Sequence, residues 1–388
     1  MGLTTVGMQF VPRELLPVIL NYLPTKTLIH CQRVCRLWQE TISKSDLLKR
    51  SQKPSQYYYE KGHSSLAPHK ISKNPVMLVE KLYCSKEGKV LLTNANLNLS
   101  FNTTLYDIKL IEGGKLIWKE QVEGGKIPHA FFLSENAFCT VVKQGSRFSL
   151  KRYEQEKGKV SLKNIKKLLL QETNLVFSSF SLLGKNYLVG SQKNQFYSYV
   201  IESDSESLTT LSTHDIVGIK TRITSKSPTL LCLSSISNTQ LLGQMLSVPS
   251  FQVMFSFSIR IPGRLYSFDF CESSLFLSYT SHLDKKEDDS PNKIQIWNNL
   301  EEKSKQEEPR KCDTEIELGD LGDSPFLQID RSVLFAINEK HTAIFEVDHL
   351  KKINTLETPN LASGFVNNYK MTWISDDSVL FAYQWETK

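Results

Sequence analysis

The stretch Ser274-Leu-Phe-Leu-Ser-Tyr279 is one of seven short apolar runs along the chain, and their spacing decides the fold. The runs start 48, 49, 43, 45, 58 and 46 residues apart. They are Lys89–Asn94, Ala137–Val142, Asn186–Ser191, Thr229–Ser234, Ser274–Tyr279, Ser332–Ile337 and Ser378–Tyr383. Self-similarity at a period of about 45 residues indicates stacked repeats, each of them one supersecondary unit.

Each apolar run lies among further short strands. A strand precedes it in every unit, as in Tyr266–Cys271, Phe326–Asp330 and Met371–Ser375. In the first six units a third strand follows it, as in Gln240–Leu246, and fourth strands follow the third, as in Phe251–Ile259. Four strands in about 45 residues form the blade of a β-propeller. We expect the apolar second strand to be buried on both faces and the alternating third strand to be more exposed.

The number of blades stays open at six or seven. The seventh unit is predicted to stop after its second strand, near Trp385, so ring closure needs strands from elsewhere. Residues 56–78 are the only spare segment on the N-terminal side. The fold class is therefore mostly β, with a small N-terminal all-α module joined to a six- to seven-bladed propeller of four-stranded blades. The predicted boundaries are 8–50 for the helical module, 51–75 for a linker and 76–388 for the propeller.

The segment from Val11 to Arg50 has helical periodicity. Apolar residues recur at three- and four-residue spacing before Pro24 and form one stripe, which consists of Leu15, Leu16, Ile19, Leu20 and Leu23. Three helices in about forty residues bury little surface by themselves. We expect a partner to cover part of the stripe.

The same segment resembles the F-box family. Val11-Pro12-Arg13-Glu14-Leu15, Leu23-Pro24, Thr27-Leu28 and Val34-Cys35-Arg36-Leu37-Trp38 follow that family's order, with departures at Val11, Pro17 and Thr27. The resemblance covers about a tenth of the chain. It implies a three-helix F-box that binds a Skp-type adaptor and, through it, a cullin-RING scaffold. The implied adaptor-binding residues are Pro12, Leu15, Leu16, Ile19, Leu20, Leu23, Leu28, Val34, Cys35 and Trp38.

The repeat units resemble degenerate WD repeats, because Ile294-Gln-Ile-Trp-Asn298 ends a third strand near the hallmark Trp-Asp. Together the two resemblances imply a non-catalytic substrate-recognition subunit of an SCF-type (Skp–cullin–F-box) E3 ubiquitin ligase. One alternative is an F-box propeller scaffold in a non-ubiquitin complex. Another is a catalytic propeller, whose candidate acids on first strands are Glu80, Asp269, Asp330 and Asp376.

A substrate surface is expected on one face of the propeller, where second-to-third turns and blade-to-blade loops meet. These loops include Asn94–Thr103, Gln144–Arg147, Ser191–Gln195 and His282–Lys293. They are rich in neutral and cationic donors, which suit an acidic or phosphorylated peptide, although a plain protein surface is an equal rival. The candidate substrate-binding residues are Lys143, Arg147 and Lys193.

Charge and composition narrow the classes of partner. The net charge is +6, and residues 1–53 hold eight Lys or Arg against three acids, or +5. No aromatic–basic motif accompanies them, so an acidic protein partner is favoured over nucleic acid. No second ligand pair accompanies His30, Cys31 and Cys35, so neither a metal nor a cofactor is expected. Scattered cysteines and the lack of a signal peptide or membrane-length apolar run indicate a cytoplasmic or nuclear protein.

Overall fold

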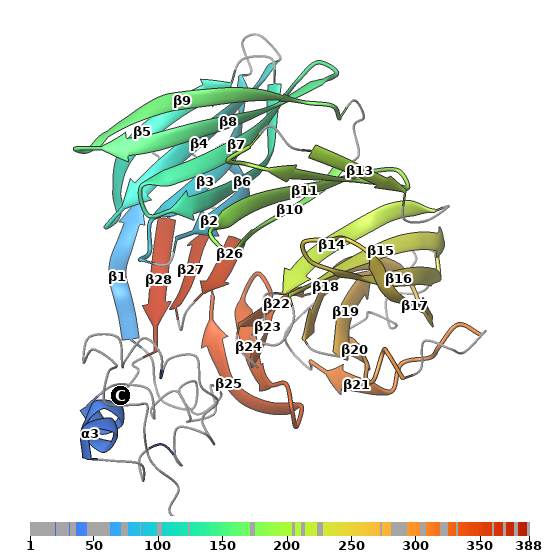
Figure 1. The fold of residues 1–388 in the computed structure, drawn as a ribbon. Helices are drawn as coiled ribbons and strands as arrows, with labels where there is room; N and C mark the ends of the chain where they lie inside the picture. Colours follow the sequence, from blue (N-terminus) through green and yellow to red (C-terminus); the bar gives the residue numbers. More distant parts are fainter. Residues whose placement is uncertain are drawn as a thin grey trace, which may run out of the picture.

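The computed structural model describes most of the propeller and three parts of the N-terminal segment. The described residues are 20, 31, 36–44, 63–70, 77–85, 87–98, 103–122, 125–170, 175–203, 206–210, 214–222, 228–271, 274–280, 293–302, 308–318, 325–330, 333–358, 361–367, 370–375 and 379–385. Within them, seven antiparallel four-stranded sheets surround a common axis and form a seven-bladed β-propeller (Figure 1). The predicted fold class is confirmed, with seven blades rather than six.

Six blades are continuous in sequence, and each runs from its innermost to its outermost strand. Blades 1 to 3 consist of β2 (Met77–Cys84), β3 (Val90–Asn98), β4 (Thr103–Glu112) and β5 (Lys115–Val122); β6 (Gly125–Ser134), β7 (Ala137–Gln144), β8 (Arg147–Glu156) and β9 (Lys159–Leu168); and β10 (Leu175–Leu182), β11 (Lys185–Gln192), β12 (Gln195–Val200) and β13 (Glu206–Thr210). Blades 4 to 6 consist of β14 (Asp215–Arg222), β15 (Thr229–Ser237), β16 (Gln240–Ser247) and β17 (Val253–Arg260); β18 (Arg264–Cys271), β19 (Ser274–Thr280), β20 (Lys293–Trp297) and β21 (Thr314–Glu317); and β22 (Phe326–Asp330), β23 (Val333–Ile337), β24 (His341–Glu346) and β25 (Lys351–Glu357).

Blade 7 joins the two ends of the propeller. Its inner three strands are β26 (Leu361–Asn367), β27 (Lys370–Ser375) and β28 (Val379–Gln384), and its outermost strand is β1 (His63–Lys70). His63 pairs with Gln384, and Lys70 pairs with Val379. The spare N-terminal segment therefore supplies the strand that closes the ring.

The prediction for the seventh unit was wrong by one strand. Ser378–Tyr383 corresponds to β28, the third strand, and Met371–Ser375 corresponds to β27, the second. The true first strand, β26, has the sequence Leu-Ala-Ser-Gly-Phe-Val-Asn, which lacks a long apolar run. The unit therefore needs only one strand from elsewhere.

Burial confirms the prediction for the second strands. It contradicts the prediction for third strands such as β20 and β24, whereas β8 alternates and is more exposed, as predicted. All five residues of the second strand β23 are buried, but so are the last five of the six in the third strand β24. Exposure lies instead on the outermost strands, such as β9 and β25. In a ring of stacked blades the second and third strands are both covered by the neighbouring blades, because only the fourth reaches the rim.

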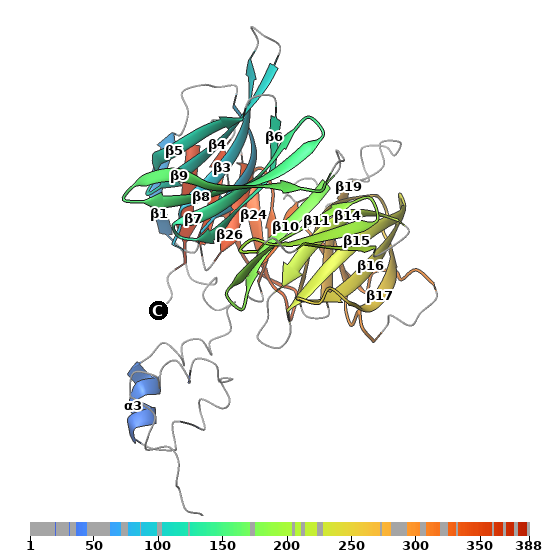
Figure 2. The ribbon, with the colours of Figure 1, turned by 45° about the horizontal axis from the view of Figure 1, so that its top comes forward.

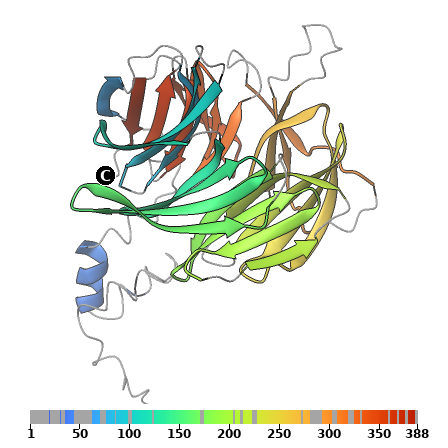
Figure 3. The ribbon, with the colours of Figure 1, turned by 90° about the horizontal axis from the view of Figure 1, so that it is seen from above.

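The blades contact one another mainly through their innermost strands. Contacts run from β2 through β6, β10, β14, β18, β22 and β26, and β26 contacts β2 again, so the ring is closed (Figure 3). Apolar cores lie between neighbouring blades. One of them joins blades 6 and 7 through Phe335, Met371, Trp373 and Trp385.

The described part of the N-terminal segment is helical. It comprises the helix α3 (Arg36–Lys44), drawn apart from the propeller in Figure 2, together with the helical residues Leu20 and Cys31. Leu20 and Cys31 are buried. Among the described residues, no helix has the length and apolar character needed to cross a membrane.

Candidate functional site: a cationic cavity on one face of the propeller

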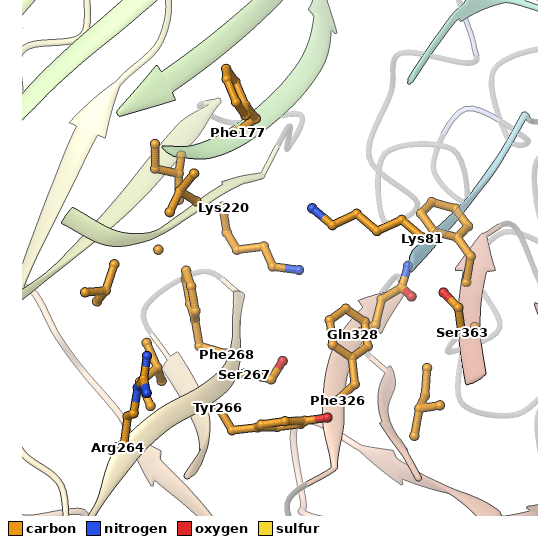
Figure 4. Close-up of a pocket in the computed structure, with 18 of the residues that line it drawn as sticks. Lys81, Phe177, Lys220, Arg264, Tyr266, Ser267, Phe268, Phe326, Gln328 and Ser363 are labelled. Carbon is orange, nitrogen blue, oxygen red and sulfur yellow. The ribbon is translucent and has the colours of Figure 1, made fainter. Parts of the chain in front are cut away.

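The innermost strands of the blades surround a cavity of about 1610 Å³ (Figure 4). Its lining includes Leu175 and Arg264, which begin first strands, and Asn238 and Glu339, which lie in second-to-third turns. In antiparallel blades these positions share one face of the ring. We call it the cavity face, and the opposite face, with His63 and Gln384, the entry face. From the cavity face the lining extends past the middle of the first strands β2 and β14, at Lys81 and Lys220.

Cations dominate the charged lining of the cavity. Among the described lining residues, four basic side chains and one carboxylate, that of Glu339, give a net charge of +3; the basic residues are Lys81, Lys220, Arg264 and Lys340. Lys81 and Lys220 extend into the cavity from different blades (Figure 4). The Nζ of Lys81 donates a hydrogen bond to the carbonyl of Pro128 at 2.9 Å. The cavity can therefore attract an anionic segment.

Apolar side chains lie exposed beside these cations. Tyr266 is 55% exposed and Phe326 is 41% exposed, although both belong to innermost strands. The Nζ of Lys220 lies 5.4 Å from the centroid of the Phe326 ring, which is within the range of a cation–π interaction. A wall that combines lysines with aromatic rings suits an extended peptide that carries both acidic and apolar residues.

His129 in the cavity wall is held as a neutral imidazole. Its ring packs against Tyr83, Phe131 and Phe177, and its Nε2 is hydrogen-bonded to the Oγ of Ser179 at 3.2 Å. Burial, and then the charge of Lys81, lowers the pKa of His129 to about 3. At neutral pH the ring is therefore uncharged and does not act as an imidazolium acid. The wall residue is therefore a packing element.

The two candidate catalytic acids whose side chains are described, Asp269 and Asp330, do not line this cavity. Its described lining holds one carboxylate, that of Glu339, whereas glycoside hydrolysis needs two. Asp330 is on β22 outside the lining, and the side chains of Glu80 and Asp376 lie outside the described residues. Among the described residues, no cluster of three or more metal-ligating side chains occurs.

Asp269, the fourth of these acids, links three blades. It is 4% exposed, and its Oδ2 accepts a hydrogen bond from the backbone N–H of Ile329 in blade 6 at 2.7 Å. The same oxygen pairs with Arg222 of blade 4 at 3.2 Å. The Nε of Arg222 in turn donates to the carbonyl of Phe270 at 2.7 Å. The position of Asp269 is explained by its structural contacts.

The predicted substrate-binding residues lie on the cavity face but outside the cavity. Lys143 and Arg147 flank the β7–β8 turn, and Lys193 lies in the β11–β12 turn of the next blade. Arg147 and Lys193 are exposed, and the Nζ of Lys143 lies 5.7 Å from the centroid of the Phe148 ring. The carbonyl of Lys193 accepts a hydrogen bond from Ile216 of blade 4 at 2.8 Å. Their role in substrate binding stays a prediction.

Of the predicted loops, one is largely a hairpin and another lies almost entirely outside the described residues. The segment Asn94–Thr103 is largely an extension of the β3–β4 hairpin, because β3 runs to Asn98 and this residue pairs with Thr103. Of His282–Lys293, only Lys293 is described, and its Nζ pairs with Glu315 at 3.1 Å. Sequence reasoning missed the lysines of the cavity, because nothing in the sequence says which side chains of a first strand face the axis.

Two of the implied adaptor-binding residues are described. Leu20 is helical and buried, and Trp38 is half-buried in α3. The others lie outside the described residues: Pro12, Leu15, Leu16, Ile19, Leu23, Leu28, Val34 and Cys35. Adaptor binding through this stripe stays a prediction.

Comparison with known proteins agrees with both parts of the chain. Residues 8–52 match the family described as F-box-like. A chain in the crystal structure of the mitotic checkpoint complex has a TM-score of 0.53 and 9% identity, covering 83% of this chain and 93% of that one, which shows the fold alone.

A second solved structure is less similar. The crystal structure of BamB from Moraxella catarrhalis has a TM-score of 0.46 and 12% identity, covering 79% of this chain and 83% of that one. No curated protein matches the chain. The chain therefore combines an F-box-like segment at residues 8–52 with a seven-bladed β-propeller.

Proposed function

We propose that the chain is the substrate-recognition subunit of an SCF-type E3 ubiquitin ligase. Its F-box-like segment binds a Skp-type adaptor, and its propeller holds a protein substrate at the cavity. The observation that carries this proposal is the placement of the two attachments on opposite faces of one rigid ring.

The chain enters the propeller on the face opposite the cavity mouth. β1 begins at His63, which pairs with Gln384 at the end of the third strand β28, so the entry from the F-box-like segment is on the entry face. The turns that rim the cavity, at Asn238 and Glu339, are on the cavity face. A subunit that joins an adaptor to a substrate must bind both at once, and this arrangement keeps the two attachments apart.

The chemistry of the cavity favours binding of an acidic peptide segment. The net charge of +3 along the lining attracts carboxylates or phosphates, and exposed Tyr266 and Phe326 offer apolar contact beside them. Lysine outnumbers arginine three to one among the cations. Since bidentate phosphate recognition is a property of arginine, carboxylates fit the cavity as well as phosphates do.

The adaptor half of the proposal is tested by co-purification. The double variant Leu15→Lys/Ile19→Lys should lose a Skp-type adaptor and its cullin in a pull-down from cells, because two charges then interrupt the apolar stripe. The thermal unfolding of the propeller should not change. Undiminished adaptor recovery with a folded propeller would rule out this binding mode.

The substrate half is tested by two matched sets of substitutions. Lys220→Glu/Lys340→Glu alters the cavity, and Lys143→Glu/Arg147→Glu/Lys193→Glu alters the predicted rim of the same face. Proteins captured by the wild type should be lost from the cavity variant, while the adaptor is retained. They should also be ubiquitinated in a reconstituted ligase reaction. If the captured proteins are lost only from the rim variant, the substrate site is at the rim. If they are captured but not ubiquitinated, the chain is better explained as a scaffold in another complex.

A further inference from the structure

The hairpin formed by β8 and β9 holds the whole net charge of the protein. Residues 147–168 contain eight Lys or Arg and two Glu, which gives +6. The full chain has 47 basic and 41 acidic residues, also +6, so 39 of each remain outside the hairpin. The concentration of charge is therefore local to the outer half of blade 2.

The charge on β9 exceeds that of the other outermost strands. β9 contains four lysines and no acid, whereas the other six range from +1 on β1, β5, β17 and β25 to −2 on β21. Lysine on an edge strand prevents edge-to-edge aggregation. The other six outermost strands of this ring have a net charge of at most +1. Protection against aggregation alone therefore does not account for the charge of +4 on β9.

The lysines of β9 are available to a partner. Lys159, Lys163 and Lys167 are exposed, and only Lys163 forms an ion pair among the described residues, with the exposed Glu156. The turn is a two-residue connection in which Lys157 and Gly158 both have positive φ, 50° and 77°, as in the tightest hairpins. The short turn fixes the start of β9, and a register shift between Leu162 and Asn164 leaves Lys163 without an opposite residue on β8, as in a β-bulge.

Apolar side chains accompany the lysines on the same strand. Leu162 is 45% exposed and Ile165 is 56% exposed. β9 is ten residues long and is the last strand of its sheet (Figure 1). Among the described strands it pairs only with β8, so its other edge has no strand partner there. Such an edge can accept a further strand from another chain, with affinity from backbone hydrogen bonds and selectivity from the side chains.

We propose that β9 is a docking edge for an acidic, extended segment of a partner protein, which adds to blade 2 as a fifth strand. Alternating acidic and apolar residues in that segment would meet the lysines and the exposed Leu162 and Ile165. Nucleic acid fits less well, because it cannot use the free backbone edge and β9 offers no aromatic ring for base stacking. The hairpin is on the rim of the ring, so the partner leaves the cavity open.

The probe for this proposal is a fluorescein-labelled (Glu-Val)₅ peptide, whose binding to the full-length chain is followed by fluorescence polarisation. We expect saturable binding that weakens as NaCl is raised from 50 to 200 mM, since exposed charges are screened. The variant Lys159→Glu/Lys163→Glu/Lys167→Glu should bind at least tenfold more weakly. The neutral variant with Gln at the same positions should be intermediate.

A matched variant controls for the change of net charge. Lys185→Glu/Lys351→Glu/Lys352→Glu reverses three exposed lysines on β11 and β25 and should bind the peptide like the wild type. A peptide of the same sequence with alternate N-methylated amides keeps its charge but loses the donors of a strand, and should bind at least tenfold more weakly.

Three results would overturn the proposal. Equal binding by the β9 variant would place the peptide elsewhere, and equal binding of the N-methylated peptide would exclude strand addition. Tighter binding of a single-stranded RNA of equal charge would make the hairpin a nucleic-acid surface. None of these results bears on adaptor or substrate binding, which the cavity and stripe variants test separately.

Discussion

Strands β18 and β9 both carry charged side chains, and their places within a blade give those charges opposite roles. Asp269 on the innermost strand β18 is buried and bonded to the blades on either side. Lys159 and Lys167 on the outermost strand β9 are exposed, without an ion pair among the described residues. The buried charge of Asp269 holds three blades together, whereas the exposed charges of β9 at the rim are open to other molecules.

Substitution of Asp269 should have the largest effect on stability. Asp269→Ala removes the acceptor of the backbone N–H of Ile329 and the ion-pair partner of Arg222, and breaking a buried ion pair costs about 3–5 kcal/mol. Chemical denaturation of the purified protein measures the loss. Asp215→Ala, which removes an exposed acid from β14, should stay within about 0.5 kcal/mol. Equal effects of the two substitutions would remove the distinction between buried and exposed charge on innermost strands.

Gln328 makes an uncharged link of the same kind between blades 6 and 7. Its Nε2 donates to the carbonyl of Val366 at 2.6 Å, and its Oε1 accepts from the N–H of Val366 at 3.0 Å. Gln328→Ala should cost about 2–3 kcal/mol, because both backbone groups of a buried residue lose their partners. The exposed Gln121→Ala on β5 serves as the control. Similar denaturation midpoints for both variants would contradict the importance of this link.

His129 should make stability depend on pH. The pKa of this side chain is lowered to about 3 in the folded protein, so as the pH falls the unfolded chain takes up the proton first. The stabilisation is complete above about pH 6.5 and is lost progressively towards pH 3. At pH 5 the loss is about 2 kcal/mol relative to pH 7.

His129→Gln is the matched variant for this pH dependence. Gln can still bond Ser179 but does not titrate, so denaturation curves at pH 7 and pH 5 should lie closer together than those of the wild type. If the two proteins lose stability in parallel, the histidine takes up its proton in the folded state and the pKa is not depressed.

The smallest effect is expected at the rim. Lys159→Ala should shift the melting temperature by less than about 2 °C, because an exposed side chain without a partner contributes little to folding. The same substitution should weaken binding of the acidic peptide. A large loss of stability would mean that the lysine packs against the blade and is not offered to a partner.

The sequence predicted the ring better than it predicted the sites. Apolar second strands such as Val333–Ile337 are easy to recognise in the sequence, because all of their residues are buried and therefore apolar. The first strand of blade 7, Leu361–Asn367, does not, since small and polar residues suffice next to the axis. This difference explains why the strand assignment predicted for the last unit is shifted by one strand from the observed one.

The cavity and the basic hairpin escaped prediction for separate reasons. Lys81 and Lys220 come from strands of different blades, and only the closed ring brings them together. The lysines of β9 are visible in the sequence, but without the strand order they could not be placed on an outermost edge. Asp269 shows the converse, because a conspicuous acid on an innermost strand is used for packing.

The pairing of His63 with Gln384 also gives the protein an order of assembly. The two residues are 321 positions apart, and contacts between distant residues form late, because a long loop must close first. During synthesis the F-box-like segment and β1 emerge from the ribosome before any complete blade. β1 has no pairing strand until residues 379–384, which form β28, have been synthesised. A chain interrupted before β28 would keep an unpaired strand edge, which is a target for aggregation and quality control. Ring closure therefore requires both the first and the last described strand of the propeller sequence.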